Sequence, residues 1–376
     1  MSKLLFVVTE DWFFVSHFLP MARAAKAEGL EVAVATRLRR HGDAIAREGL
    51  RTIAVEAERA SLNPLNIAAT FLRIVRAIRD ERPDIVHCIA LKSVVLGGLA
   101  ARLLGTKSII LAPTGLGELW VGEGLRYRLV RTAIRTIVRS LLRAPHIHYV
   151  FENSEDPVEF GLDPKGPGVT IVGGAGVDPD IFPPAPEPAA PPIKIAVIAR
   201  MIWPKGIGDA VEATRLARAA GVPVELSLFG EPDPSNRQSI PSDVLAGWSA
   251  EPGIAWRGRT TDVPRVWREH HIAMLLSYYR EGVPRTLLEA AAAARPIVTT
   301  DVAGCREIVR DGIEGLLVPP RDPGAAARAI ERLARDPALR LKLGKNARAH
   351  VRTRFTEAAI MRAVGALYAS RPDGAL

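Results

Sequence analysis

Short apolar runs alternate with longer amphipathic stretches along both halves of the chain. In the first half, buried strands are predicted at 3–8, 31–35, 84–89 and 108–112. Ser16 is placed to cap a helix that runs to about residue 28, before Gly29. In the second half, strands are predicted at 193–199, 223–229, 272–277, 296–300 and 315–318, with helices at 206–220, 263–269, 284–294 and 305–310. This alternation predicts an α/β protein with parallel sheets and right-handed crossovers.

A proline-rich segment separates the two halves. Residues 183–192 hold so many prolines that helix is excluded, and the segment is predicted as an extended linker between a domain at 1–182 and a domain at 193–357. Beyond Asp322 the pattern is helical and ends in a helix within 358–376. Two Rossmann-like domains of this kind are expected to face each other and to bind ligands in the cleft between them, at the carboxyl ends of the strands.

Composition narrows the class of protein. A chain of 376 residues has room for two cores, and its two cysteines, Cys88 and Cys305, exclude a disulfide scaffold and a cysteine-rich zinc site. No secretory signal and no long uncharged apolar run is recognised, so a cytoplasmic protein is predicted. The net charge of +9 indicates an anionic partner, which can be nucleic acid, lipid or a phosphorylated ligand.

The most informative stretch lies at 278–289, after a predicted strand and at the start of a predicted helix. Pro284 suits the first helical turn, and the free backbone N–H groups beside it favour a diphosphate. Glu289, one turn further on, can accept hydrogen bonds from ribose hydroxyls, and Glu281 can meet sugar hydroxyls or a developing positive charge. The alternative is that Glu289 is a solvated helix residue. The alanines at 290–294, which are typical of a packed helix, disfavour that alternative.

A second loop of the same domain carries positive charge. Arg200 and Lys205 lie on either side of a predicted turn between a strand and a helix, where they can neutralise a diphosphate leaving group. Alone, the two side chains are better explained as solvated loop charges. Their occurrence with the stretch at 278–289 favours a shared anion site.

These motifs together resemble those of the family 4 retaining glycosyltransferases with the GT-B fold. The resemblance rests on E-x7-E at Glu281 and Glu289, on the segments 295–301 and 315–322, on Arg200 with Lys205-Gly206, and on 176–182. It implies two facing Rossmann-like domains with a C-terminal helix that crosses back onto the first. It also implies a nucleotide-sugar donor, transfer with retention at the anomeric carbon, and no obligatory metal or other cofactor.

The resemblance also implies roles for single residues. Arg200 and Lys205 would contact the diphosphate, Glu289 the ribose, and Glu281 with the backbone after it the sugar. The catalytic candidates are Glu281, Lys205 and Arg200. The donor-binding candidates are Arg200, Lys205, Glu281, Gly282, Val283, Pro284, Arg285, Thr286 and Glu289. Asp178-Pro179-Asp180 has the spacing of a metal motif but is interpreted as a turn, and no metal ligands are predicted.

The acceptor side is assigned to the first domain. Its candidates are Glu10, Ser16, His17, His87, Lys92, Gly115 and Gly117. The family often has a second histidine two residues after the position of His87, where this chain has Ile89, and His87 also fits a buried core residue. The pattern of Thr9, Ser16-His17, His87, Lys92, 114–117 and 279–285 resembles bacterial enzymes that extend polyprenyl-diphosphate-linked sugars.

One segment suggests contact with a membrane. Residues 124–144 contain no acid, and Arg128, Arg131, Arg135 and Arg139 recur at helical spacing. Leu129, Val130, Ile134, Ile137 and Leu141 are expected on the opposite side. Such a helix is typical of a surface that binds anionic lipid, or of a helix that covers a sheet with its arginines in water. The first interpretation places the protein peripherally at the inner face of the plasma membrane.

The resulting hypothesis is a hexosyltransferase that moves a hexose or N-acetylhexosamine from a nucleotide sugar, with UDP the most frequent nucleotide of the family. The acceptor would be a polyprenyl-diphosphate-linked or other oligosaccharide in surface polysaccharide or glycan assembly. Alternatives on the same fold are a nucleotide-sugar epimerase and a phosphorylase, which would need a pyridoxal-phosphate lysine. A basic nucleic-acid-binding protein would need aromatic and basic residues interleaved on one surface, whereas the arginines here alternate with aliphatic residues.

Overall fold

The computed structural model describes residues 2–56, 63–234 and 236–370, which form two compact units. Unit 1 comprises residues 1–176 and 357–376, and unit 2 comprises residues 177–356. The segment 183–192, expected as a linker between domains, therefore falls within unit 2. Two buried arginines bind it there: Arg340 pairs with Glu187 at 2.8 Å, and Arg295 donates to the carbonyl oxygens of Ala185 and Pro186.

Unit 1 is built on a parallel sheet of seven strands in the order β3-β2-β1-β4-β5-β6-β7. The strands are β1 (Lys3–Glu10), β2 (Glu31–Arg37), β3 (Arg51–Ala54), β4 (Ile85–Ile89), β5 (Ser108–Ala112), β6 (Ile147–Phe151) and β7 (Val169–Ile171). The four strands with continuous apolar runs were predicted. Three strands were not predicted. The edge strands β3 and β7 are short and only partly covered, so they carry no apolar run, and β6 was missed although it is largely buried.

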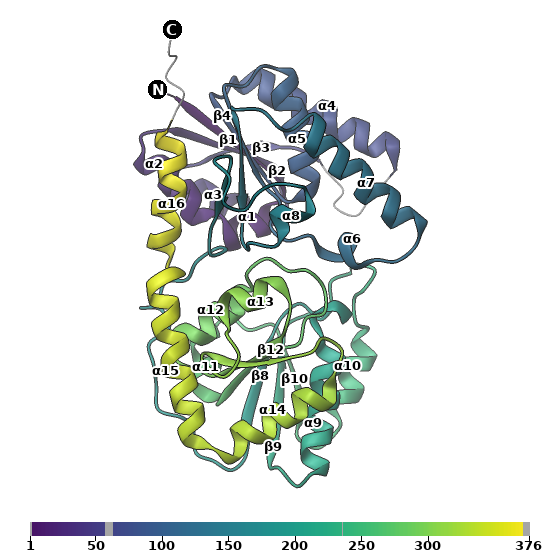
Figure 1. The fold of residues 1–376 in the computed structure, drawn as a ribbon, viewed down its shortest axis with the longest axis vertical. Coiled ribbons are helices and arrows are strands. Elements are labelled where there is room, and N and C mark those ends of the chain that lie inside the picture. Colours follow the sequence, from purple (N-terminus) through teal and green to yellow (C-terminus); the bar gives the residue numbers. More distant parts are fainter. Residues whose placement is uncertain (1, 57–62, 235, 371–376) are drawn as a thin grey trace. The chain divides into compact units, whose positions relative to one another are not determined.

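Helices cover both faces of this sheet. One face is covered by α1 (Asp11–His17), α2 (Leu19–Ala27), α3 (Gly42–Arg47) and the last helix, α16 (Glu357–Ala369), which lies beside α2 (Figure 1). The other face is covered by α4 (Pro64–Glu81), α5 (Leu91–Leu103), α6 (Gly117–Val121) and α7 (Leu125–Ser140), while the short α8 (Asp156–Glu159) follows β6. The return of α16 to unit 1 agrees with the fold expected for the chain.

The first helix differs from its prediction. The expected helix from Ser16 to residue 28 is two helices, because Pro20 has no N–H to donate to the carbonyl of residue 16. Ser16 is not a cap. It lies inside α1, where its hydroxyl donates to the Phe13 carbonyl oxygen at 3.2 Å.

Unit 2 holds a parallel sheet of six strands in the order β10-β9-β8-β11-β12-β13. Its strands are β8 (Ile193–Ile198), β9 (Val224–Phe229), β10 (Ile254–Gly258), β11 (Ile272–Leu275), β12 (Ile297–Thr300) and β13 (Gly315–Val318). One face packs against α9 (Ile207–Ala219), α10 (Ser242–Ser249) and α14 (Pro323–Arg335). The other packs against α11 (Val263–Glu269), α12 (Arg285–Ala292), α13 (Ala303–Ile308) and α15 (Pro337–Arg354). All predicted elements of this half are present, within two residues at each end.

Both sheets reverse their strand order once, between β1 and β4 in unit 1 and between β8 and β11 in unit 2. At such a reversal the loops that leave the two neighbouring strands run to opposite faces, which opens a crevice at the carboxyl edge. In the parts of the chain that the structure describes, no helix is long and apolar enough to cross a bilayer.

Candidate donor site in unit 2

The loops that leave β8 and β11 bring the predicted basic and acidic residues together. Arg200 follows β8, and Lys205 closes a single 3-10 turn (Trp203–Lys205) before α9. Gly206 then adopts a φ of 68°, and a β-carbon there would lie 1.9 Å from the Leu276 carbonyl oxygen. Glycine is therefore required at the point where the turn after β8 touches the end of β11.

Lys205 and Glu281 form a buried ion pair at the centre of this site. The Lys205 Nζ lies 2.7 Å from the Glu281 Oε1, and the Glu281 side chain is only 5% exposed. The same oxygen accepts a hydrogen bond from the hydroxyl of Ser277, which is fully buried. The backbone of Ser277 is held in turn, because its carbonyl oxygen accepts a hydrogen bond from the Thr300 hydroxyl. Glu281 is thus fixed by groups from both loops.

The pair determines the charge of the lysine. Burial alone would lower the pKa of Lys205, but the adjacent Glu281 carboxylate outweighs burial and raises it. Tyr279 lies against the same ammonium, whose Nζ is 5.6 Å from the centroid of the tyrosine ring. Burial raises the pKa of Tyr279, and the charge of Glu281 adds to that effect. The site therefore holds a cationic lysine beside a neutral phenol.

The helix α12 begins beside this pair. Pro284 is the N-cap and has an extended ψ of 115°, so the helix starts at Arg285, one residue later than predicted. Glu289 is buried and pairs with Arg285 at 3.0 Å, and its burial raises the pKa of its carboxyl group. The buried hydroxyl of Thr286 has no hydrogen-bond partner among the described residues. Glu289 is consequently not the solvated residue of the alternative interpretation.

Arg200 has a partner that the sequence did not reveal. Its Nη1 lies 2.8 Å from the Oδ2 of Asp233, which follows the carboxyl end of β9. The backbone around both residues is paired, since Met201 N–H donates to the Glu231 carbonyl oxygen at 3.0 Å. A usable signal exists in retrospect: in a parallel sheet, residues that follow adjacent strands lie at the same edge.

The arrangement suits a ligand with a diphosphate and a sugar. Two cationic side chains, Arg200 and Lys205, lie at the carboxyl edge beside the N-terminus of α12, where free N–H groups and the helix dipole favour an anion. Gly282 and Gly304 bring two backbones close together, because a β-carbon at Gly304 would lie 1.8 Å from the Gly282 carbonyl oxygen. The loop that carries Glu281 is therefore packed against α13.

Asp178 and Asp180 form a turn, as predicted from the sequence of this Asp-Pro-Asp motif. The Asp180 N–H donates to the Asp178 Oδ1 at 3.0 Å, so the first carboxylate is engaged with the backbone. Within residues 2–56, 63–234 and 236–370, no group of three or more His, Cys, Asp or Glu side chains has the geometry to hold a metal ion.

The acceptor-side candidates of unit 1 are carried by β1, α1, β4, α5 and the segment after β5. Glu10 pairs with Arg37 at 3.6 Å, at the ends of β1 and β2. The Ser16 hydroxyl lies 2.6 Å from the His17 Nδ1 on α1. Gly115, in the loop after β5, and Gly117, the first residue of α6, have positive φ values of 84° and 56°, a conformation that suits glycine.

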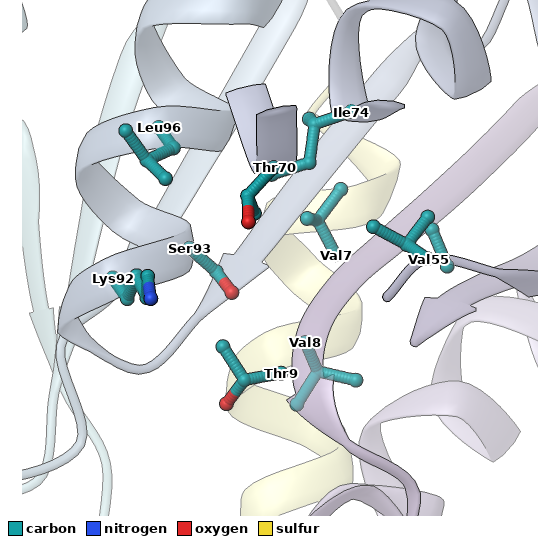
Figure 2. Close-up of a pocket in the computed structure, with 10 residues that line it drawn as sticks. Val7, Val8, Thr9, Val55, Thr70, Ile74, Lys92, Ser93 and Leu96 are labelled. Atoms are coloured by element: carbon teal, nitrogen blue, oxygen red, sulfur yellow. The ribbon is translucent and has the colours of Figure 1, made fainter. Parts of the chain in front are cut away.

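Lys92 belongs to a small cavity. It lies in the first turn of α5 and lines this cavity together with Ser93 and with Thr9 from β1, while the remaining walls are largely apolar (Figure 2). Side chains of α4, including Thr70 and Ile74, close the other side. None of the other acceptor-side candidates lines the cavity.

His87 lies inside the sheet. It is fully buried in β4, and its Nδ1 is 2.8 Å from the hydroxyl of Tyr368 on α16. Burial lowers the pKa of His87 to about 3, so the ring is neutral at neutral pH. Its Nε2 has no partner among the described residues. The geometry corresponds to the buried core histidine that the sequence left as an alternative.

The arginines predicted as a membrane face are largely engaged within unit 1. Arg131 donates to three backbone carbonyl oxygens between residues 119 and 122. Arg135 binds both the carboxylate and the backbone carbonyl of Glu159, and Arg139 donates to the carbonyl that follows α8. Of the aliphatic residues expected opposite the arginines, Ile134 is buried and Val130 and Ile137 pack against the core, whereas Leu129 and Leu141 are 61% and 45% exposed. Val138, which was not among the expected residues, is buried beside Ile134.

Comparison with known proteins agrees with this architecture. Residues 3–140 match the family described as glycosyl transferase 4-like, and residues 192–336 match the family described as glycosyl transferases group 1. The two matches cover most of both units. The second match includes every donor-site residue described above. The chain belongs to the family 4 type of glycosyltransferase and is a transferase with the GT-B fold.

Two curated relatives span nearly the whole chain. The N,N'-diacetylbacillosaminyl-diphospho-undecaprenol alpha-1,3-N-acetylgalactosaminyltransferase of Campylobacter jejuni is 26% identical over 349 residues, which are 89% of this chain and 90% of that protein. A putative glycosyltransferase of Bacillus subtilis, EpsD, is 26% identical over 388 residues, which are 99% of this chain and 97% of that protein. The chain is thus similar to glycosyltransferases of glycan biosynthesis.

Solved structures share the fold at lower identity. A glycosyltransferase from Rickettsia africae has a TM-score of 0.76 at 18% identity and covers 98% of this chain and 97% of its own. HepE of Anabaena, solved in complex with UDP and glucose, has a TM-score of 0.75 at 15% identity. The match covers 98% of this chain and 100% of HepE.

Proposed function

We propose that the protein is a retaining glycosyltransferase that moves a hexose or N-acetylhexosamine from a UDP-sugar to a polyprenyl-diphosphate-linked glycan acceptor. The observation that carries this proposal is the buried pair of Lys205 and Glu281, placed beside Arg200 and the start of α12. It supplies positive charge for a diphosphate and a carboxylate for a sugar within a few ångströms, which is the requirement of a nucleotide-sugar donor.

The proposed chemistry follows from charge. When the bond between the anomeric carbon and the diphosphate oxygen breaks, negative charge grows on the diphosphate, and Lys205 and Arg200 stabilise it. The acceptor hydroxyl forms the new bond on the same face of the sugar and passes its proton to the departing diphosphate oxygen. Glu281 orients the sugar through its hydroxyls, and Glu289 accepts hydrogen bonds from the ribose. The backbone N–H groups between Gly282 and Thr286 complete the diphosphate contacts, and no metal ion is assigned a role.

Two comparisons support the choice of substrates. The Anabaena structure holds UDP, and the name of the Campylobacter relative specifies a diphospho-undecaprenol acceptor. A lipid-linked acceptor places the reaction at a membrane surface, and we propose the inner face of the plasma membrane. The acceptor-side groups are proposed to come from unit 1, with Lys92 and His17 as the polar candidates.

A donor screen with product analysis tests this proposal. Radiolabelled UDP-, GDP- and ADP-sugars are offered together with a short polyprenyl-diphosphate glycan, and the anomeric configuration of the product is read by NMR. We expect transfer from a UDP-sugar with the configuration of the donor kept. A product of opposite configuration would contradict retention, and the absence of transfer from every donor would contradict the function.

Lys205→Ala is expected to lower kcat more than it raises the donor KM. Its ammonium meets charge that grows only in the transition state, so the loss is about 100- to 1,000-fold in kcat. Lys342→Ala, an exposed lysine of α15, is the matched control and should behave as wild type. Lys205→Arg keeps the charge beside Glu281 and should retain more activity, which separates lost catalysis from a collapsed buried pair. A change confined to KM would contradict the assigned role.

A further inference from the structure

The exposed face of α7 combines leucine with unpaired arginine. Leu125, Leu129, Thr132 and Thr136 recur at i, i+4, i+7 and i+11, so they lie on one side of the helix. All four are exposed, and Leu125 and Leu129 have exposed fractions of 69% and 61%. The opposite side, around Ile134 and Val138, is the one that packs on the sheet. The leucines therefore do not serve the core of unit 1.

Two arginines flank the leucines and are not used inside the unit. Arg126 and Arg128 are both exposed, and neither guanidinium has a hydrogen-bond or ion-pair partner among the residues that the structure describes. They differ in this from Arg131, Arg135 and Arg139, which bind groups of unit 1. Glu123 precedes the helix, and no acid occurs between residues 124 and 144. The first two turns of α7 thus present two apolar side chains and a net positive charge.

A second helix on the same face of the sheet gives an internal comparison. On α4, Leu65 and Leu72 are as exposed, at 78% and 64%. Two of its three arginines have partners: Arg76 pairs with Asp80 at 3.5 Å, and Arg73 donates to the Glu56 carbonyl oxygen, while Arg79 is exposed. The α4 leucines therefore lie on a helix that also carries two acids, Asp80 and Glu81, whereas the α7 leucines lie on a helix that carries none.

We propose that Leu125 and Leu129 of α7 insert into an anionic lipid leaflet while Arg126 and Arg128 contact its phosphate groups. The proposal rests on the function proposed above only in choosing lipid as the occupant, since a lipid-linked acceptor lies in such a leaflet. It replaces the four-arginine stripe as the contact surface, because three of those arginines already hold α7 to its own unit.

The chemistry of the surface fits a bilayer interface. A short apolar stripe flanked by cations lies in the plane of the headgroups, with the leucines among the upper acyl segments and the guanidiniums at the phosphates. Each component contributes a separable part: apolar burial acts on any lipid, whereas the arginines act only on anionic lipid and are screened by salt. Nucleic acid would be bound by the arginines without the leucines.

Flotation of the full-length protein with vesicles tests the proposal. Wild-type protein should bind phosphatidylglycerol-containing vesicles more tightly than pure phosphatidylcholine vesicles. Leu125→Gln with Leu129→Gln should weaken binding to both vesicle types by at least about tenfold, given the apolar area removed. Arg126→Gln with Arg128→Gln should abolish the preference for phosphatidylglycerol, and high salt should do the same to wild type.

The matched control is Leu65→Gln with Leu72→Gln on α4, which makes the same chemical change at equal exposure. It should bind vesicles as wild type does. Unchanged binding of the α7 leucine variant, or equal loss in the α4 variant, overturns the proposal. The proposal is also overturned if the wild-type protein is a dimer, the α7 leucine variant is a monomer, and both bind vesicles equally. The leucines would then contact a second copy of the chain.

Failure of this proposal can be told from failure of the proposed function. Vesicle binding is measured without any sugar donor, and transfer is measured on a water-soluble acceptor analogue without vesicles. Loss of vesicle binding in the α7 leucine variant with unchanged soluble transfer supports both. Vesicle binding that depends on the leucines, in a protein that transfers no sugar, supports the surface and rejects the enzyme assignment.

Discussion

Glu281 has two carboxylate oxygens, and the bonds to Lys205 and Ser277 both go to Oε1. The side chain is therefore oriented by one oxygen, and Oε2 is the oxygen that can meet a sugar hydroxyl. Under the proposed function Ser277 is a positioning residue, because its hydroxyl contacts Glu281 and any effect on the sugar passes through that carboxylate. It is the last residue of the strand predicted at 272–277, four positions before Glu281.

At the residue scale, we expect Ser277→Ala to lower kcat about 10- to 100-fold, through loss of a hydrogen bond to a charged group worth about 1.5–3 kcal/mol. UDP affinity, measured by thermal shift, should stay unchanged, because the effect concerns the sugar. Ser277→Thr should restore turnover by returning the hydroxyl.

The control is Thr299→Val, which removes a buried hydroxyl that donates to the Leu275 carbonyl oxygen at 2.7 Å in the adjacent strand. It should cost stability without changing the ratio of turnover to UDP affinity. Wild-type kcat in Ser277→Ala would show that Glu281 needs no second anchor.

At the element scale, the contact between α16 and β4 ties the end of the chain to unit 1. The Tyr368 hydroxyl and the His87 Nδ1 meet at 2.8 Å in a fully buried environment, 281 positions apart in the sequence. Around them, Ile360 and Val364 of α16 pack into the same core as Phe6 of β1. The helix is therefore held by apolar burial and by one buried polar pair.

We expect this pair to make the free energy of unfolding depend on pH. Burial lowers the pKa of His87 to about 3 in the folded protein, against the ordinary value of about 6.5 in the unfolded chain. The unfolded state binds more protons, so the contribution is complete above pH 6.5 and declines as the pH falls from there towards 3. Between about pH 7 and pH 5 the loss from His87 is about 2 kcal/mol.

Urea unfolding at the two pH values measures the effect. In His87→Leu with Tyr368→Phe, which leaves neither partner unpaired, the pH dependence should be smaller by that amount. Burial also lowers the pKa of His148, His270, His271 and His350, so their contributions have the same sign and remain in the variant. An equal pH dependence in both proteins would show that burial does not lower the pKa of His87.

At the scale of the whole molecule, the two units divide the predicted roles. Every donor-site candidate lies within residues 177–356, and every acceptor-side candidate lies within residues 1–176. We expect UDP to raise amide hydrogen-exchange protection most strongly at 200–206 and 277–289, because a ligand that binds only the folded site opposes its local opening. Segments of the acceptor side, such as 9–17 and 87–92, should change less.

Exchange followed by mass spectrometry, with and without UDP, checks this expectation. Glu289→Ala should reduce the protection at 277–289, whereas Glu269→Ala on the exposed end of α11 should leave it intact. Protection confined to unit 1 would move the nucleotide out of unit 2 and contradict the donor site.

The sequence by itself determined the elements and residue types that depend on local pattern. Central strands such as β1, β8 and β11 are continuous apolar runs because both faces are covered, and so they can be read from any single chain. The spacing of Glu281 and Glu289 can also be read from the sequence alone. One glutamate lies just before α12 and the other lies one turn inside it, so both are near the start of the helix. The resemblance to a known family rested on these local patterns.

The tertiary structure decided which side chains meet across the sheet edge and which face of a helix is covered. Arg200 finds Asp233 and Glu281 finds Lys205 because parallel strands bring distant loops to one edge, and no local pattern specifies such a partner. The proline-rich segment belongs to unit 2 because Arg340 and Arg295 bind it. The same reason applies to α7: periodicity defines the faces of a helix, and only the position of the core decides that Ile134 is buried while Leu129 is exposed.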